Sequence, residues 1–244
     1  MSPIVVLHKV AAHVQRRSPW LGSRMMLALE RRRGEPEYAI LDQLVDRRRR
    51  ALDIGANAGM YTGALLPLVT GVIAFEPNPA LAAQARRAWP RARIEQCALG
   101  DATGEAELRM PVSEAGVVMS GYASIAAGKQ WAREQRVTVP VRRLDDFHLT
   151  AIGFIKIDVE GHELATVRGG WDTITRERPT MLIESEADHA PGCPQALVDL
   201  LATIGYSAQF YDGTVVRPFA DWSPARRARH YDGPINNFIF RPAP

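Results

Sequence analysis

The chain has 244 residues, 46% of them hydrophobic, which is enough for one large α/β core with little left for a second. Its net charge of +3, from 30 basic and 27 acidic residues, is too small to indicate a nucleic-acid-binding protein. The two cysteines form neither a metal-ligand pair nor a disulfide framework, which favours a reduced, cytoplasmic protein. The apolar run at residues 4–7 is too short for a signal peptide or a membrane helix, so we expect neither export nor membrane contact.

The first 50 residues have a helical pattern, and we expect them to form an extension that precedes one domain at residues 51–244. Two arginine runs, at 31–33 and 47–50, are interpreted as a solvated helix face and a solvated linker, because no aromatic residues interleave with them. The pattern leaves open whether the extension pairs two copies into a homodimer or covers a binding pocket.

From residue 51 the chain alternates strand and helix, which predicts a mostly parallel sheet with helices on both faces. The expected parallel strands are 51–55, 71–76, 92–97, 153–158 and 180–185, and the expected helices are 58–69, 79–89, 161–171 and 194–204. Two late segments, 206–211 and 235–241, are expected to form an antiparallel pair at one edge. Residues 101–150 interrupt the alternation with two extra strands, near 105–110 and 137–141, that flank a long insertion at 113–131.

The most informative segment is the turn after the first of these strands, where Gly55 and Gly59 are four residues apart. This is not the glycine spacing of a dinucleotide site, but small residues here let a ligand approach the backbone closely. Asp53 ends the strand and could bind a cationic amino group or water, and Asn57 tolerates unusual backbone angles. Glu76 ends the next strand, where a carboxylate accepts hydrogen bonds from a ribose diol.

No phosphate-binding loop accompanies this turn. The pattern therefore favours a cofactor with a ribose and a charged amino-acid tail but no pyrophosphate, namely S-adenosylmethionine (SAM), with S-adenosylhomocysteine (SAH) as its product. A nicotinamide-dependent oxidoreductase stays open as the alternative enzyme class.

From residue 50 to about 241 the chain resembles the FkbM family of SAM-dependent methyltransferases. The segments that carry the resemblance, in order, are Asp53-Ile54-Gly55-Ala56-Asn57-Ala58-Gly59, Phe75-Glu76-Pro77-Asn78-Pro79, Ala98-Leu99-Gly100-Asp101, Leu144-Asp145-Asp146-Phe147, Ile155-Lys156-Ile157-Asp158-Val159-Glu160-Gly161-His162-Glu163, Gly169-Gly170 and Asn237-Phe238-Ile239-Phe240.

The resemblance implies a Rossmann-like class I methyltransferase fold at 51–244, with a seven-stranded, mostly parallel sheet. It implies methyl transfer, mostly to a hydroxyl oxygen of a small-molecule natural product or sugar, while transfer to nitrogen, carboxylate or RNA stays open. The residues that the resemblance assigns to the cofactor are Asp53, Gly55, Ala56, Asn57, Gly59, Glu76, Pro77 and Asn78, with Ala98, Leu99 and Gly100 at the adenine and Asp158 at the methionine end.

The segment from Lys156 to Glu163 is expected to hold the catalytic groups. An alcohol acceptor must lose its proton as the new bond forms, and histidine is the usual base near neutral pH. His162 falls at the start of a helix on the carboxyl edge of the sheet, so we expect it to be the general base, oriented by Glu160 or Asp158. The alternative is that His162 only begins the helix.

For the acceptor we expect contacts from the insertion, through Tyr122 and Ser124, and from Lys156, Glu184 and Asn236. Lys156 is expected either to pair with Asp158 or Glu184 or to hold an anionic acceptor. Asp158 and Glu184 lack a clear third ligand, so we expect no metal. No Asp/Asn-Pro-Pro-Tyr motif follows residue 157, which argues against methylation of a nucleic-acid base. Four further residues are weighed as lining the pocket, Trp131, Trp222, Tyr231 and Asn237.

Overall fold

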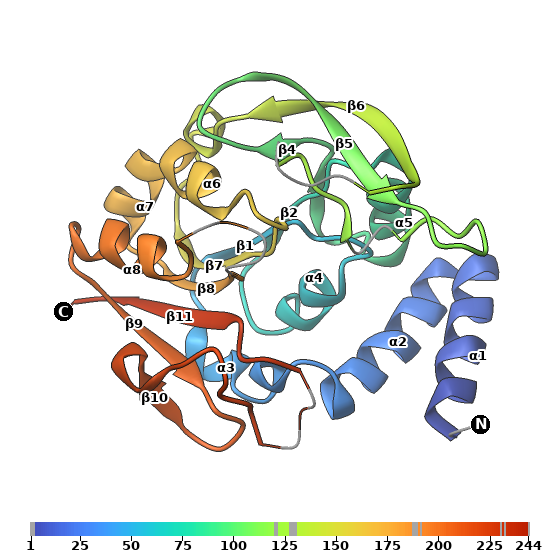
Figure 1. Cartoon of the computed structure of the whole chain (residues 1–244), viewed down its shortest axis with the longest axis horizontal. Helices are drawn as coiled ribbons and strands as arrows, with labels where there is room; N and C mark the ends of the chain where they lie inside the picture. The colour runs from blue at the N-terminus through green and yellow to red at the C-terminus, as the bar shows by residue number, and fades with distance from the viewer. Residues whose placement is uncertain are drawn as a thin grey trace.

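The computed structural model describes residues 3–119, 122–126, 131–186, 190, 192–229, 231 and 233–243 (Figure 1). Its helices are α1 (Pro3–Arg17), α2 (Pro19–Arg33), α3 (Leu41–Leu44), α4 (Met60–Leu65), α5 (Pro79–Ala88), α6 (Glu163–Gly169), α7 (Trp171–Glu177) and α8 (Gln195–Ala202), with short 3-10 helices η1 (Pro36–Ala39), η3 (Leu144–Phe147) and η4 (Phe219–Asp221). Its strands are β1 (Arg50–Ile54), β2 (Val72–Phe75), β3 (Arg93–Glu95), β4 (Ala98–Leu99), β5 (Gly104–Pro111), β6 (Glu134–Arg142), β7 (Ile152–Ile157), β8 (Thr180–Glu184), β9 (Tyr206–Tyr211), β10 (Val216–Pro218) and β11 (Asn237–Pro242).

The central sheet has the strand order β10-β9-β11-β8-β7-β1-β2-β3. β1 pairs in parallel with both β2 and β7, and β11 runs antiparallel between β8 and β9. This is the expected Rossmann-like sheet, but the expected count of seven strands is wrong, because β10 adds an eighth. After β9 the Asp212 carboxylate accepts the N–H groups of Thr214 and Val215, and the chain turns back through Gly213 (φ 84°) to form β10.

Helices cover both faces of the sheet, as the strand–helix alternation predicts. Leu52 and Ile54 of β1 pack in one cluster with residues of α6, α7 and α8, while Ala51 packs on the other face with residues of α2, α4 and α5. Figure 1 shows these two helical layers on opposite sides of the sheet. All six residues of β7 are buried, which is typical of a parallel strand covered on both faces.

The extra N-terminal helices pack against the domain that follows them. α2 lies against α4 and α5, and α1 lies outside it against α2 (Figure 1). The Arg31 guanidinium donates to the Ala64 carbonyl oxygen at 3.3 Å. The division at residue 50 into an extension and a domain stays a prediction. None of the described helices has the length and apolar character needed to cross a bilayer.

Two expected elements are shorter in the structure than predicted, and each is followed by a separate element. The expected strand at 92–97 ends at Glu95, and Ala98–Leu99 instead join a separate three-stranded sheet, β4-β6-β5, formed with the two extra strands. The expected helix at 161–171 ends at Gly169, and α7 begins at Trp171. The break lets α6 pack onto the end of β4, where the Thr166 hydroxyl donates to the Leu99 carbonyl oxygen at 3.0 Å.

A substitution at Gly169 tests this packing. A Cβ on Gly169 would lie 1.8 Å from the Gly100 carbonyl oxygen, so Gly169→Ala must displace the backbone that follows β4. We expect a loss of about 1–3 kcal/mol in the free energy of unfolding, measured by chemical denaturation. Gly104→Ala is the matched control, because a Cβ there meets no heavy atom within 4 Å. Equal stability of the two variants would contradict the packing described.

Candidate active site

The turn after β1 is held open by residues with positive φ. Gly55 has φ 81°, and a Cβ on it would lie 1.7 Å from the Asp158 carbonyl oxygen. The Asp158 N–H in turn donates to the Ile54 carbonyl oxygen at 2.9 Å. Asn57 (φ 51°) and Gly59 (φ 81°) complete the turn, and Gly59 is the residue before α4. Glycine at position 55 therefore lets the backbone after β1 pack directly against the backbone after β7, with no side chain between them.

The carboxylate of Glu76 joins this turn to the next one. One oxygen accepts the Asn57 N–H at 2.7 Å and the other accepts the Asn78 N–H at 2.8 Å. Glu76 is only 5% exposed, and its burial outweighs these hydrogen bonds and raises its pKa to about 7. Asn78 itself caps α5, because its side-chain oxygen accepts the N–H groups of Ala80 and Leu81.

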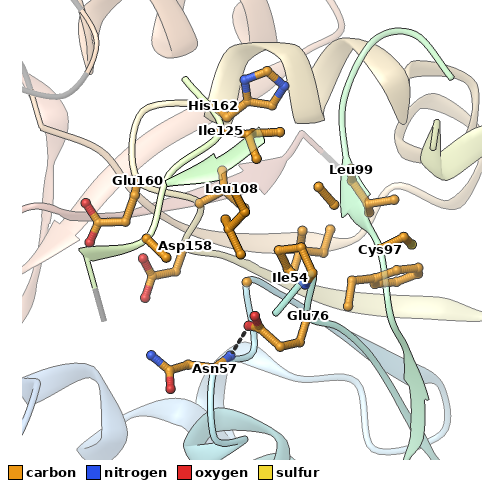
Figure 2. Close-up of a pocket in the computed structure, with 16 residues that line it drawn as sticks. Ile54, Asn57, Glu76, Cys97, Leu99, Leu108, Ile125, Asp158, Glu160 and His162 are labelled. Carbon is orange, nitrogen blue, oxygen red and sulfur yellow. Dashed lines mark hydrogen bonds between the residues drawn. The ribbon is translucent and has the colours of Figure 1, made fainter. Parts of the chain in front are cut away.

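A cavity, here called cavity A, opens beside Glu76 (Figure 2). Nine of the predicted site residues line it, namely Gly55, Asn57, Glu76, Pro77, Ala98, Leu99, Asp158, Glu160 and His162. The other lining residues, which sequence reasoning missed, are Ile54, Phe75, Cys97, Leu108, Ala123, Ile125 and Val159. Leu99, Leu108 and Ile125 make one part of the wall apolar, whereas Asn57 and Asp158 make another part polar.

His162 lies on the Leu99 side of cavity A. A Cβ on Gly100 would lie 3.0 Å from His162 Nε2, so the glycine leaves room for the ring. Figure 2 shows the ring apart from Asn57 and Asp158, with the Glu160 carboxylate directed away from it. Burial lowers the pKa of His162, and the charge of Asp101 offsets this only in part, so the site favours the neutral ring. His162 precedes α6 and makes no side-chain cap to it.

A second cavity, cavity B, shares Gly55, Asn57 and Asp158 with cavity A. Its other lining residues are Glu30, Glu35, Tyr38, Asp53, Ala56, Ala58, Met60, Tyr61 and Lys156. The predicted cofactor residues Asp53 and Ala56 thus lie at this cavity. Asp53 is 2% exposed and accepts the Thr62 hydroxyl at 2.5 Å, and its burial raises its pKa to about 6.

Lys156 is fully buried in the wall of cavity B. Its ammonium donates to the Asn237 side-chain oxygen at 2.8 Å and lies 5.0 Å from the centre of the Tyr61 ring. It is also 3.8 Å from a Glu184 oxygen, which is one of the two pairings expected for it. Burial alone would lower the pKa of Lys156, but Asp158 and the other carboxylates around it outweigh that effect and raise it. For Asp158, burial has the opposite effect and raises the pKa to about 7, although the positive charge of Lys156 opposes this shift.

Glu184 lies at a smaller hollow beside Asp158 and Glu160, and Asn236 is hydrogen-bonded to it. The Asn236 amide donates to Glu184 at 2.7 Å and to Glu186 at 2.6 Å. Burial, followed by the charge of Asp158, raises the pKa of Glu184 to about 9. Within the described ranges, no three histidine, cysteine or acidic side chains are placed to hold a metal ion.

Several residues proposed from the sequence line neither cavity. Tyr122 is 54% exposed, whereas Ser124 is buried and its hydroxyl donates to the Glu160 carbonyl oxygen at 2.7 Å.

Trp222 also lies away from both cavities. It packs on Phe238, and its indole N–H donates to the Ile235 carbonyl oxygen. The remaining members of this group are Gly59, Asn78, Gly100, Trp131, Tyr231, Glu184, Asn236 and Asn237. Residues 120, 121 and 127–130 of the insertion lie outside the described residues.

Sequence reasoning missed the acidic and aromatic wall of cavity B. Glu35 and Tyr38 lie in the extension, where no motif marks them, and Tyr61 follows the glycine turn directly. The only available signal is the segment Glu35-Pro36-Glu37-Tyr38, in which a proline interrupts the helical pattern of the first 50 residues.

A Rossmann-like sheet, a glycine turn without a phosphate loop and a carboxylate at the end of β2 together define a SAM-dependent methyltransferase. Residues 53–208 match the Methyltransferase FkbM domain, so this chain belongs to the FkbM methyltransferase family. It is 31% identical over 183 residues to the 2-O-methyltransferase NoeI of Sinorhizobium fredii, a match that covers 66% of this chain and 74% of that protein.

The fold is similar to a solved structure of a methyltransferase FkbM from Methylobacillus flagellatus. The TM-score is 0.54 at 16% sequence identity, and the match covers 97% of this chain. This chain spans 58% of the length of that solved chain. At this identity the likeness concerns the fold.

Glu76 provides the test of cofactor binding. The expected ribose contact requires the ionised form of the Glu76 carboxylate. Because the pKa of Glu76 is about 7, the ionised form is replaced by the protonated form as pH falls, so wild-type affinity for SAM should rise from pH 6 to pH 8. Glu76→Ala should weaken SAM and SAH binding by about tenfold at pH 8 and reduce the change with pH, as measured by titration calorimetry. Unchanged affinity in the variant would contradict the ribose contact. Glu95→Ala, on neighbouring β3, is the matched control.

Proposed function

We propose that the protein transfers a methyl group from SAM to a hydroxyl oxygen of a small molecule such as a natural product or a sugar. The observation that carries the proposal is the pair of adjoining cavities, which share Gly55, Asn57 and Asp158. One cavity can hold a nucleoside while the other holds an acceptor. The 2-O-methyltransferase name of the Sinorhizobium fredii relative supports transfer to oxygen.

The polarity of the two cavities supports one orientation of the cofactor. Leu99, Leu108 and Ile125 suit an adenine ring, and Glu76 suits the ribose diol. The cationic end would then point toward Asp158 and Asp53, where carboxylates favour positive charge. A Cβ on Gly55 would clash with the Asp158 carbonyl oxygen, so glycine is required where the ends of β1 and β7 meet beside the proposed cofactor.

When bound, SAM supplies an electrophilic methyl group on a sulfonium sulfur, which an acceptor atom displaces in line. The chain has to orient the acceptor, exclude water and receive its proton. Transfer to nitrogen, carboxylate or RNA is not favoured by the relative's name, and a nicotinamide cofactor is not favoured by the family. A small-molecule acceptor, the absence of a nucleic-acid partner and a homodimer stay proposals.

The product identifies the function. Methyl-¹³C SAM and a panel of sugars and hydroxylated natural products should yield a methyl ether, recognised by the carbon chemical shift of the new methyl group. EDTA should leave the rate unchanged, because no metal takes part in this proposal. A methylamine or methyl ester as the sole product, or binding of NADH in place of SAM, would contradict it.

The position of His162 generates a separate prediction. Its ring lies at the Leu99 side of cavity A, which favours a contact with the adenine end over proton removal from the acceptor. His162→Ala should therefore weaken SAM binding by about tenfold, while kcat at saturating SAM stays within about threefold of wild type. These values come from titration calorimetry and steady-state kinetics.

The opposite pattern would establish His162 as the general base expected from the sequence. In that case kcat would fall at least about tenfold with cofactor affinity unchanged. His148→Asn is the control, because His148 is exposed and has a positive φ that asparagine tolerates.

A further inference from the structure

A groove lies between α2 of the N-terminal extension and the segments that follow α4 and α5. This groove, here called the α2 groove, shares no lining residue with cavity A or cavity B. The family match begins at residue 53, so the α2 side of the groove is not part of the matched domain. Its lining includes Trp20, Arg24 and Arg31 of α2, Leu66 after α4, and Trp89 and Arg91 after α5.

The α2 groove has an apolar wall that packing holds in place. Leu66 and Trp89 contribute to this wall, and Trp89 is only 4% exposed. A Cβ on Gly63 would lie 2.3 Å from the Trp89 ring, so glycine at that position leaves the space that the indole occupies. The indole N–H of Trp89 donates to the Ala58 carbonyl oxygen at 3.4 Å. The groove therefore presents a fixed apolar surface that the apolar part of a ligand can contact.

Three arginines give the α2 groove its charge. Arg24, Arg31 and Arg91 line it, and no acidic side chain is among the described residues that do so. The Arg24 guanidinium lies 4.9 Å from the centre of the Trp20 ring, and the Arg31 guanidinium donates to the Ala64 carbonyl oxygen at 3.3 Å. Within the described part of the chain, none of the three forms an ion pair with a carboxylate. Their positive charges are therefore available to an anion.

Trp20 adds an aromatic surface that faces solvent, because its side chain is 50% exposed. A guanidinium pairs with a carboxylate, sulfate or phosphate through two parallel hydrogen bonds, whereas an indole contacts aliphatic and aromatic groups. The combination suits a ligand that has an apolar part and one anionic group.

The charge of the extension argues against a second copy of this chain in the groove. Residues 1–34 contain seven lysine and arginine side chains and one acidic side chain, which gives a net charge of +6, against +3 for the whole chain. Two copies that met through their α2 grooves would bring these like charges together. The three arginines are also few for a nucleic acid, whose binding engages many phosphates.

We propose that the α2 groove binds an amphiphilic organic anion, which is a small molecule with an aliphatic or aromatic part and one carboxylate, sulfate or phosphate group. Arg24 and Arg91 pair with the anionic group, while Trp20 and Trp89 contact the apolar part. The inference goes beyond methyl transfer and does not depend on it, because the groove shares no lining residue with either cavity of the active site.

Octanoate, octanamide and acetate test the proposal. Octanamide keeps the chain and shape of octanoate without its charge, and acetate keeps the charge without the chain. Their dissociation constants are measured by ligand-observed NMR at pH 8, in the absence and in the presence of SAH. We expect octanoate to bind with a Kd below about 1 mM and the other two compounds to bind at least about tenfold more weakly. SAH should not displace octanoate.

Variants at exposed positions separate the two parts of the site. Arg24→Gln and Arg91→Gln in one chain should weaken octanoate binding at least about tenfold, to the level of octanamide, because the anionic group loses both partners. Trp20→Ala should weaken octanoate binding about threefold through the lost apolar contact. Arg87→Gln is the matched control, because Arg87 is an exposed arginine of α5 that does not line the groove. Thermal denaturation shows that each variant is folded.

Equal binding of octanoate and octanamide, unchanged octanoate affinity in the double variant, or displacement of octanoate by SAH would each overturn the proposal. Absence of octanoate binding up to about 10 mM would also overturn it, including the case in which the protein instead sediments with phosphatidylglycerol vesicles or binds RNA. Failure of methyl transfer is a separate result, because the octanoate measurement without SAH needs neither cofactor nor acceptor.

Discussion

The hydrogen bonds of Glu76 are the constraint on which the rest of the site depends. Its two carboxylate oxygens accept N–H groups from the turn after β1 and from the turn after β2, so one side chain sets the spacing of two strand ends. The first turn carries Gly55 and Asn57, which lie between both cavities, and the second continues into the cap of α5. A buried carboxylate with a pKa near 7 is costly in an apo-protein, and a ligand that donates two hydroxyls compensates that cost.

The site changes character along its length. Aliphatic side chains from the small sheet and the insertion form one part of cavity A, while cavity B is built from carboxylates, tyrosines and one lysine. The proposed cofactor has a flat apolar base at one end and a sulfonium and an ammonium at the other. Only one orientation places the base at the aliphatic wall and the positive charges at the carboxylates.

Sequence reasoning succeeded where a residue's role is local. An apolar run followed by small residues predicts the β1 turn, and a lone glutamate after the next run predicts a carboxylate beside that turn, because both depend on strand ends that parallel pairing brings together. The ribose contact of Glu76 stays a prediction. Sequence reasoning failed where the contact partner is distant in sequence. Glu35 meets Asn237 across 202 residues, and the space that places the His162 ring depends on Gly100 in another element. The extra strand β10 depends on a turn in which the Asp212 carboxylate accepts backbone N–H groups. The strand itself has only three residues, which is too short for a recognisable hydrophobic pattern.

The position of β11 bears on how the protein assembles. This last strand inserts between β8 and β9, and within the described chain β9 and β10 join the large sheet only through it. Asn237 at its start also supplies the bonds to Glu35 and Lys156. During synthesis from the N-terminus, the Gly55 turn and Glu76 emerge early and can come together locally, whereas the bonds of Asn237 to Glu35 and Lys156 form only after β11 is made. A chain truncated before β11 would therefore keep the segments that form the glycine turn but lose the contacts that fix Glu35 and Lys156 beside it.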